Sequence, residues 1–93
     1  EAITLLPQNP ALYRSLFEVY SKQENREEAA AVLKEGIKNV PQAIDLYVLL
    51  ARYLNEGGQK EEARSYYTQA IKQAELVGNK TLQADIEAER DML

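Results

Sequence analysis

The sequence contains no cysteine and no histidine. Without cysteine the protein has no thiolate nucleophile and no disulfide, and without histidine it lacks the imidazole base and most zinc ligands. No other grouping of nucleophile, base and metal ligands stands out. We therefore expect no enzymatic activity, no catalytic residue, no metal site and no cofactor.

Proline and glycine are scarce, with three and four residues among 93, so that long helices are allowed. No apolar run approaches the roughly 20 residues needed to span a bilayer. No basic segment followed by an apolar one marks a signal peptide. These absences favour a soluble protein and slightly favour the cytoplasm. Because the sequence opens on Glu1 rather than Met, we expect either a segment of a longer protein or a processed product.

An excess of positive charge is also missing. Eleven Lys and Arg face fifteen Asp and Glu, which gives a net charge of -4. The basic residues are interleaved with acidic ones and form no block. A protein that binds a phosphate backbone needs a Lys/Arg face, so we expect no nucleic-acid partner.

What the sequence does contain is an internal repeat with a period of 34 residues. Residues 11–42 set against 45–76 give eight identities in 32 positions. The same offset places residues 1–8 over 35–42, where Glu, Ile, Pro and Gln match. The sequence therefore predicts the tail of a preceding repeat at 1–8, a repeat at 9–42, a second repeat at 43–77 and a further segment at 78–93.

Each repeat has the pattern of two helices, because apolar residues recur at helical spacing in both halves. Asn9 and Pro10 predict the first helix start, since Asn caps free amides and Pro fits the first helical position. Asn25 and Glu28 predict a capping box at the start of the second helix. The acidic pairs at 27–28 and 61–62 are then helix starts, since adjacent helical residues point about 100° apart and cannot converge.

The segment 78–93 departs from the repeat and is mostly polar. A stacked helical array ends in a unit with one polar face. We interpret 78–93 as a capping helix that covers the second repeat with four residues. They are Leu82, Ala84, Ile86 and Ala88.

A 34-residue helix-turn-helix with this arrangement of small and large residues resembles the tetratricopeptide repeat (TPR) family. The family's first-helix aromatic and leucine fall on Tyr13 and Leu16, then on Tyr47 and Leu50. Its second-helix alanine falls on Ala29 and Ala63, its next small residue on Gly36 and Ala70, and its closing proline on Pro41. Two positions depart from the pattern. Phe17 replaces a small residue, which predicts spread or reoriented helices, and Glu24 replaces the turn glycine that the second repeat keeps as Gly58.

The resemblance implies an all-α fold, a TPR-like α-solenoid of stacked antiparallel helix pairs with about five helices plus the leading fragment. It also implies a protein-interaction scaffold that holds a peptide segment or a partner helix in a concave groove lined by the first helix of each repeat. Carried over to this sequence, the groove residues are Arg14, Glu18, Ser21, Val48, Leu49, Arg52 and Asn55.

Two of these residues leave the interpretation open. Val48 and Leu49 make the segment at 46–54 apolar almost all round, although a surface helix normally keeps one polar face. Either they contact a ligand, or another subunit or further repeats cover them. The alternative function is therefore self-assembly, with the apolar groove wall as a subunit interface of a homo-oligomer. Arg14 and Arg52 would select an acidic or carboxylate-bearing partner.

Overall fold

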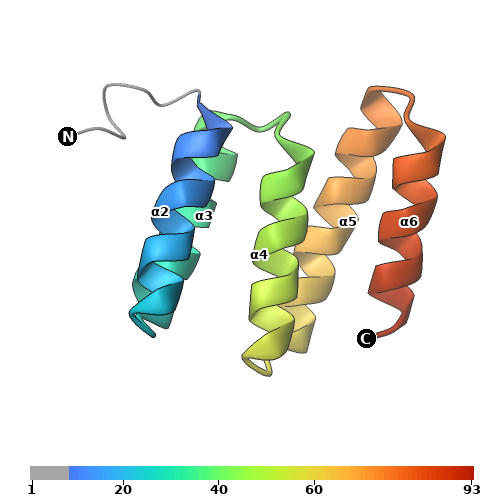
Figure 1. Cartoon of the computed structure of the whole chain (residues 1–93). Helices are drawn as coiled ribbons and strands as arrows, with labels where there is room; N and C mark the ends of the chain where they lie inside the picture. Colours follow the sequence, from blue (N-terminus) through green and yellow to red (C-terminus); the bar gives the residue numbers. More distant parts are fainter. Residues whose placement is uncertain (1–8) are drawn as a thin grey trace. The chain divides into compact units, whose positions relative to one another are not determined.

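The computed structural model describes residues 9–93 and contains five α-helices (Figure 1). The helices are α2 (Pro10–Lys22), α3 (Arg26–Asn39), α4 (Ile44–Glu56), α5 (Lys60–Leu76) and α6 (Lys80–Asp91). The predicted all-α fold is confirmed. The leading fragment predicted at 1–8 lies outside the described residues. The chain divides into two compact units, with the boundary between Leu46 and Tyr47, within α4.

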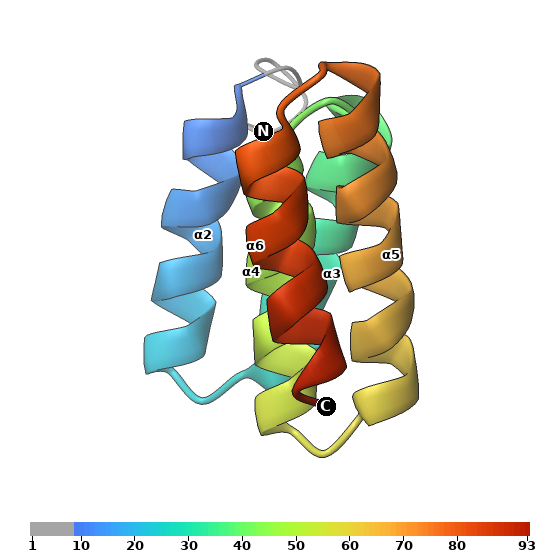
Figure 2. The same cartoon turned by 90° about the vertical axis from the view of Figure 1, so that its right-hand side faces the viewer.

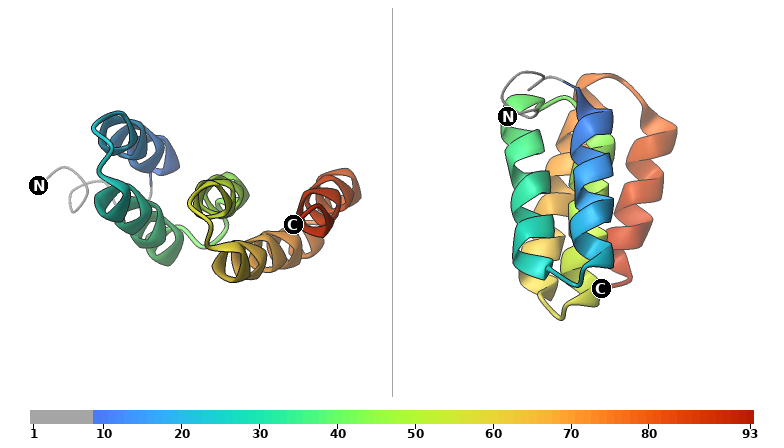
Figure 3. Two further views of the ribbon diagram at one scale, coloured as in Figure 1. Left: turned by 90° about the horizontal axis from the view of Figure 1, so that it is seen from below. Right: turned by 60° about the vertical axis from the view of Figure 1, so that its left-hand side comes forward.

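The first unit contains the antiparallel pair α2 and α3, which lie side by side in Figures 1 and 3. The helix α2 starts as predicted, because the side chain of Asn9 accepts a hydrogen bond from the amide of Ala11 at 3.1 Å. The core of the first unit includes Tyr13 and Leu33, which are fully buried. Phe17 is only 8% exposed, so the unit accommodates the large side chain in its interior.

Gly36, a small residue of the repeat pattern, lies at a close contact in this unit. A Cβ atom on Gly36 would lie 2.8 Å from Cγ of Tyr13 and 2.9 Å from Cδ1 of Leu46. Both distances are shorter than real Cβ contacts. The absence of a side chain at Gly36 therefore lets the Tyr13 ring and the Leu46 side chain pack directly on the backbone of α3.

The turn between α2 and α3 corrects the predicted capping box. Glu24 adopts φ of 59°, and the amides of Glu24 and Asn25 bond the carbonyls of Ser21 and Tyr20. This is the Schellman arrangement that closes many helices. Because the Asn25 amide is already engaged, Glu28 cannot reach it, and the Asn25 side chain makes no capping bond. The capping box at Asn25 and Glu28 was wrong, although the helix start itself lies where it was predicted.

In the second unit α5 packs against α6, and Figures 1 and 2 show α5 antiparallel to both α4 and α6. The unit repeats the turn geometry of the first, with Gly58 at φ of 84° and Gly78 at φ of 72°. Its interior holds the apolar stripe predicted for α5. The buried residues of that stripe are Ala63, Tyr67, Ala70, Ile71 and Ala74.

The helix α6 lies where the capping helix was predicted, but its inner face differs. Ile86 is 2% exposed and Leu82 is half-buried, whereas Ala84 and Ala88 are exposed. The assignment of Ala84 and Ala88 to the covering face was wrong. Residues two apart cannot share a helix face, because a turn takes 3.6 residues.

Candidate functional site

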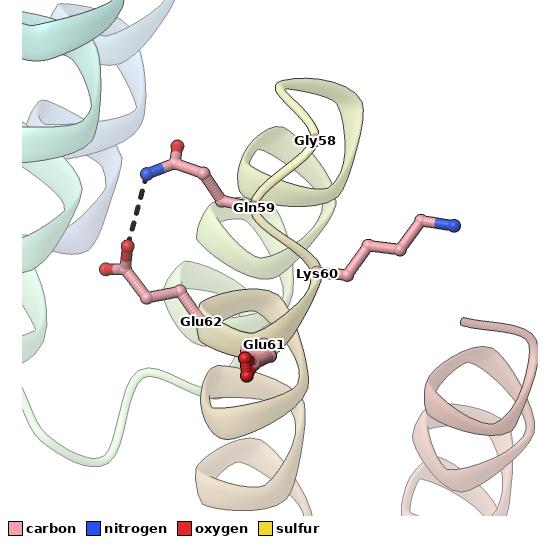
Figure 4. Close-up of a pocket in the computed structure, with 5 residues that line it drawn as sticks. All are labelled: Gly58, Gln59, Lys60, Glu61 and Glu62. Carbon is pink, nitrogen blue, oxygen red and sulfur yellow. Dashed lines mark hydrogen bonds between the residues drawn. The ribbon is translucent and has the colours of Figure 1, made fainter.

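The acidic start of α5 borders a surface hollow of about 370 Å³, shown in Figure 4. Its side chains diverge, as the sequence predicted. Glu62 accepts a hydrogen bond from Gln59 at 3.2 Å, while Glu61 and Lys60 point elsewhere. Over residues 9–93 no group of three or more acidic side chains could hold a metal ion. We therefore see a solvated helix start rather than a binding site.

The predicted groove residues of α2 lie in the first unit. Arg14 forms an ion pair with Asp45, and both side chains are about half exposed, at 47% and 48%. Glu18 on the same helix is exposed, and Ser21 is half-buried. The guanidinium of Arg14 is thus already neutralised within the unit. An acidic partner would have to displace Asp45 to reach it.

The remaining predicted residues lie on α4, in the second unit. Val48 is 9% exposed and Leu49 is half-buried. Arg52 is exposed, and Asn55 is half-buried three residues further along the helix. Since most of Val48 is covered, Leu49 is the more accessible apolar residue of this pair.

Arg52 is engaged in a two-point interaction that joins α4 to α6. Its Nε and one Nη atom donate hydrogen bonds to the two carboxylate oxygens of Glu89, both at 2.7 Å. The hydroxyl of Tyr67, on α5, donates to the same carboxylate at 3.1 Å. Bidentate arginine–carboxylate pairs are among the strongest hydrogen-bonded contacts in proteins. One carboxylate therefore connects all three helices of the second unit.

The pKa values of these three groups follow from that geometry. The hydrogen bonds from Arg52 lower the pKa of Glu89, and Glu89 in turn raises the pKa of Arg52. Burial, with the hydrogen bond to Glu89, raises the pKa of Tyr67 to about 12. At neutral pH the arginine and the carboxylate are charged and the phenol is neutral. These are the protonation states that the hydrogen bonds of the network require.

A second hollow, of about 290 Å³, opens beside this network and is termed the α4–α6 hollow. Its lining residues are Arg52, Asn55, Glu56, Tyr67, Glu89, Met92 and Leu93. The structure thus brings Arg52 and Asn55 together at one depression. Glu89 was missed because α6 was assigned the wrong face. The spacing from Leu82 through Ile86 to Glu89 is helical and would have placed this carboxylate on the inner side.

Comparisons with known proteins agree with this architecture. Residues 44–75 match the model of the tetratricopeptide repeat. The chain is similar to the solution NMR structure of a tetratricopeptide repeat domain protein from Salinibacter ruber, with a TM-score of 0.80 and 20% sequence identity. That similarity covers 90% of this chain and 85% of the other. The comparison with characterised proteins gave no match. The resemblance to the TPR family is thereby confirmed. In the part of the chain that is described, no helix is long and apolar enough to cross a bilayer.

Proposed function

Because this chain carries a tetratricopeptide repeat within a TPR fold, we propose that it is a protein-interaction scaffold whose first helices, α2 and α4, bind a peptide segment or a partner helix. Proteins with this repeat typically bind other proteins or peptides. The proposal assigns contacts to the predicted groove residues of each helix. Nothing in the donor chemistry of residues 9–93 suggests catalysis, and we propose no enzymatic role.

The observation that carries the proposal is the α4–α6 hollow. Helical recognition surfaces commonly combine a concave, partly apolar area with a few polar groups that fix orientation. The lining of the α4–α6 hollow includes both kinds of residue, with Met92 and Leu93 as the apolar members and Asn55 and Glu56 among the polar ones. Leu49 adds a half-buried apolar residue to the same helix, two turns before Glu56. A bound segment would gain apolar contact from the first group and orientation from the second.

The test is capture of peptides from a random 12-residue displayed library on the immobilised chain. We expect a family of related peptides to be enriched, and the variant Asn55→Ala to weaken their binding. The control is Ser65→Ala, an exposed position on α5 away from the α4–α6 hollow. Val48→Glu is unsuitable, because a carboxylate at a 9% exposed position would unfold the helix. Failure to enrich any peptide would sink the proposal.

A second candidate is self-assembly, and the end of α5 favours it. Leu76 is 78% exposed and Val77 is 62% exposed, which leaves two large apolar side chains in water. Exposed neighbouring apolar residues often mark a contact surface. Sedimentation velocity at several concentrations tests this candidate. If the chain sediments as a monomer at all concentrations, and the variant Leu76→Ser/Val77→Ser has the same sedimentation coefficient, self-assembly is ruled out.

A further inference from the structure

We infer that the α4–α6 hollow selects a partner segment by a basic side chain, arginine or lysine, whose cationic end binds Glu56 and whose stem lies along Met92 and Leu93. This inference rests on the proposed function and specifies its partner chemistry. It also reverses the expectation from the sequence, in which Arg14 and Arg52 would select an acidic partner.

The first step is the charge on the wall of the α4–α6 hollow. Arg52 is the only cationic residue in the lining. Its Nε and one Nη atom donate hydrogen bonds to the two carboxylate oxygens of Glu89, both at 2.7 Å. This pair is neutral overall. Glu56 also lines the α4–α6 hollow, is exposed, and pairs with no cation within residues 9–93. The lining therefore carries one uncompensated negative charge, which attracts a cation and repels a carboxylate.

The second step concerns the helix ends. The helix α4 ends at Glu56 and α6 ends at Asp91, and both ends lie at the same side of the second unit (Figure 1). The C-terminal end of a helix carries partial negative charge on its last carbonyls. Two such ends next to the α4–α6 hollow add to the charge of Glu56. From α5 only Tyr67, in its second turn, belongs to the lining, so the N-terminal amides of α5 lie farther from the hollow than the C-terminal end of α4.

The third step is the shape of the side chain that fits. Met92 is 84% exposed, and Leu93 is half-buried beside it. A thioether side chain adapts to many apolar shapes. Arginine and lysine combine a flexible apolar stem with a cationic end, which matches an apolar wall next to a carboxylate. The oxygen of the Asn55 side chain is a further acceptor for a guanidinium or ammonium donor.

The experiment uses individual peptides recovered from the displayed library, labelled and measured by fluorescence anisotropy on the whole chain. We expect arginine or lysine to be enriched at one peptide position. Glu56→Gln should weaken these peptides about fivefold, as expected for one exposed charge pair. The matched control is Glu75→Gln, since Glu75 is likewise an exposed glutamate in the last turn of a helix but lies outside the α4–α6 hollow. It should change affinity less than about twofold.

A charge reversal separates the two proposals. Glu56→Lys should reject the basic peptides and accept variants in which the basic residue is replaced by glutamate. If peptides bind but show no preference for basic residues, or bind Glu56→Gln as well as the unaltered chain, this inference is wrong and the scaffold function stands. If no peptide binds at all, the scaffold function fails with it.

Discussion

The two repeats follow one pattern but satisfy it with different residues at the same position. The small residue of the second helix is Gly36 in the first repeat and Ala70 in the second. Gly36 faces Leu46, whose counterpart 34 residues later is Lys80, an exposed residue. The second repeat carries a methyl group at this position, in Ala70; it keeps a tyrosine, Tyr47, at the position of Tyr13 but has no leucine at the position of Leu46. The comparison teaches that one repeat position accepts different sizes, and that in the first repeat Tyr13 and Leu46 leave room only for glycine.

The turns show a second difference. Glu24 and Gly58 occupy the same position of the repeat, and both adopt positive φ, at 59° and 84°. Glycine adopts this conformation without strain, whereas a residue with a Cβ atom does not. The backbone hydrogen bonds of the two turns are equivalent. The repeat pattern thus dictates the backbone conformation, and the first repeat adopts it with an unfavourable residue.

The largest predicted effect comes from the crowded position. Gly36→Ala should lower the free energy of unfolding by about 2 kcal/mol, because overpacking against Tyr13 and Leu46 exceeds the gain in helix propensity. Urea denaturation measures this change. The control is Ala31→Gly, an exposed position in the same helix, where only the propensity loss of about 1 kcal/mol applies. A more stable Gly36→Ala variant would contradict the packing described for the first unit.

The turn position should give the next largest effect, with opposite signs in the two repeats. Gly58→Ala should destabilise the chain by about 1 kcal/mol, since a methyl group at positive φ is strained. No atom lies within 4 Å of the added Cβ, so the effect is that of the backbone alone. Glu24→Gly should stabilise by less, about 0.5 kcal/mol, because glycine also increases the entropy of the unfolded chain. Thermal unfolding of both variants measures these changes. If both substitutions shift the unfolding temperature in the same direction, the prediction is wrong.

These differences also show what the sequence could and could not predict. The 34-residue period placed the described helices well, because large and small residues at fixed spacing decide which faces are buried. The turn conformation at Glu24 escaped prediction, since nothing in a glutamate indicates positive φ. The pairing of Arg52 with Glu89 escaped it as well, because partners 37 residues apart meet only through the tertiary fold. The predicted groove set therefore included the arginine but not the carboxylate that neutralises it.

The two arginine–carboxylate pairs should differ in the free energy by which their partners are coupled, and this difference is smaller than the effects above. Arg52 and Glu89 form two hydrogen bonds between side chains that are 57% and 32% exposed, whereas Arg14 and Asp45 meet through one pair of atoms between side chains that are 47% and 48% exposed. Double-mutant cycles with alanine should give a coupling of about 1 kcal/mol for the first pair and about 0.3 kcal/mol for the second. Equal couplings would contradict the role assigned to the two-point contact.

Acid should remove the larger coupling. The pKa of Glu89 is lowered in the folded chain, so its contribution is complete above the pKa of an unfolded glutamate. It is lost as the pH falls through the lowered folded value. The coupling free energy that the double-mutant cycle gives for Arg52 and Glu89 should therefore approach zero in strongly acidic buffer. A coupling that is independent of pH would mean that the carboxylate charge does not hold the helices together.

The smallest effect on stability at neutral pH, but the most specific signal, belongs to Tyr67. Its counterpart in the first repeat is Leu33, which has no titratable group. Because the pKa of Tyr67 is raised to about 12, folding favours its neutral form. Its contribution to stability is complete below the unfolded value of 10.0 and is lost as the pH rises toward 12. Burial also raises the pKa of Tyr47, so absorbance titration of tyrosinate should show late ionisation from both groups, and the part near pH 12 should disappear in Tyr67→Phe. In Glu89→Gln the Tyr67 group should ionise earlier, since the anion that disfavours a second negative charge is gone. An unchanged late phase in that variant would show that burial alone sets the pKa, and that the hydrogen bond to Glu89 contributes nothing measurable.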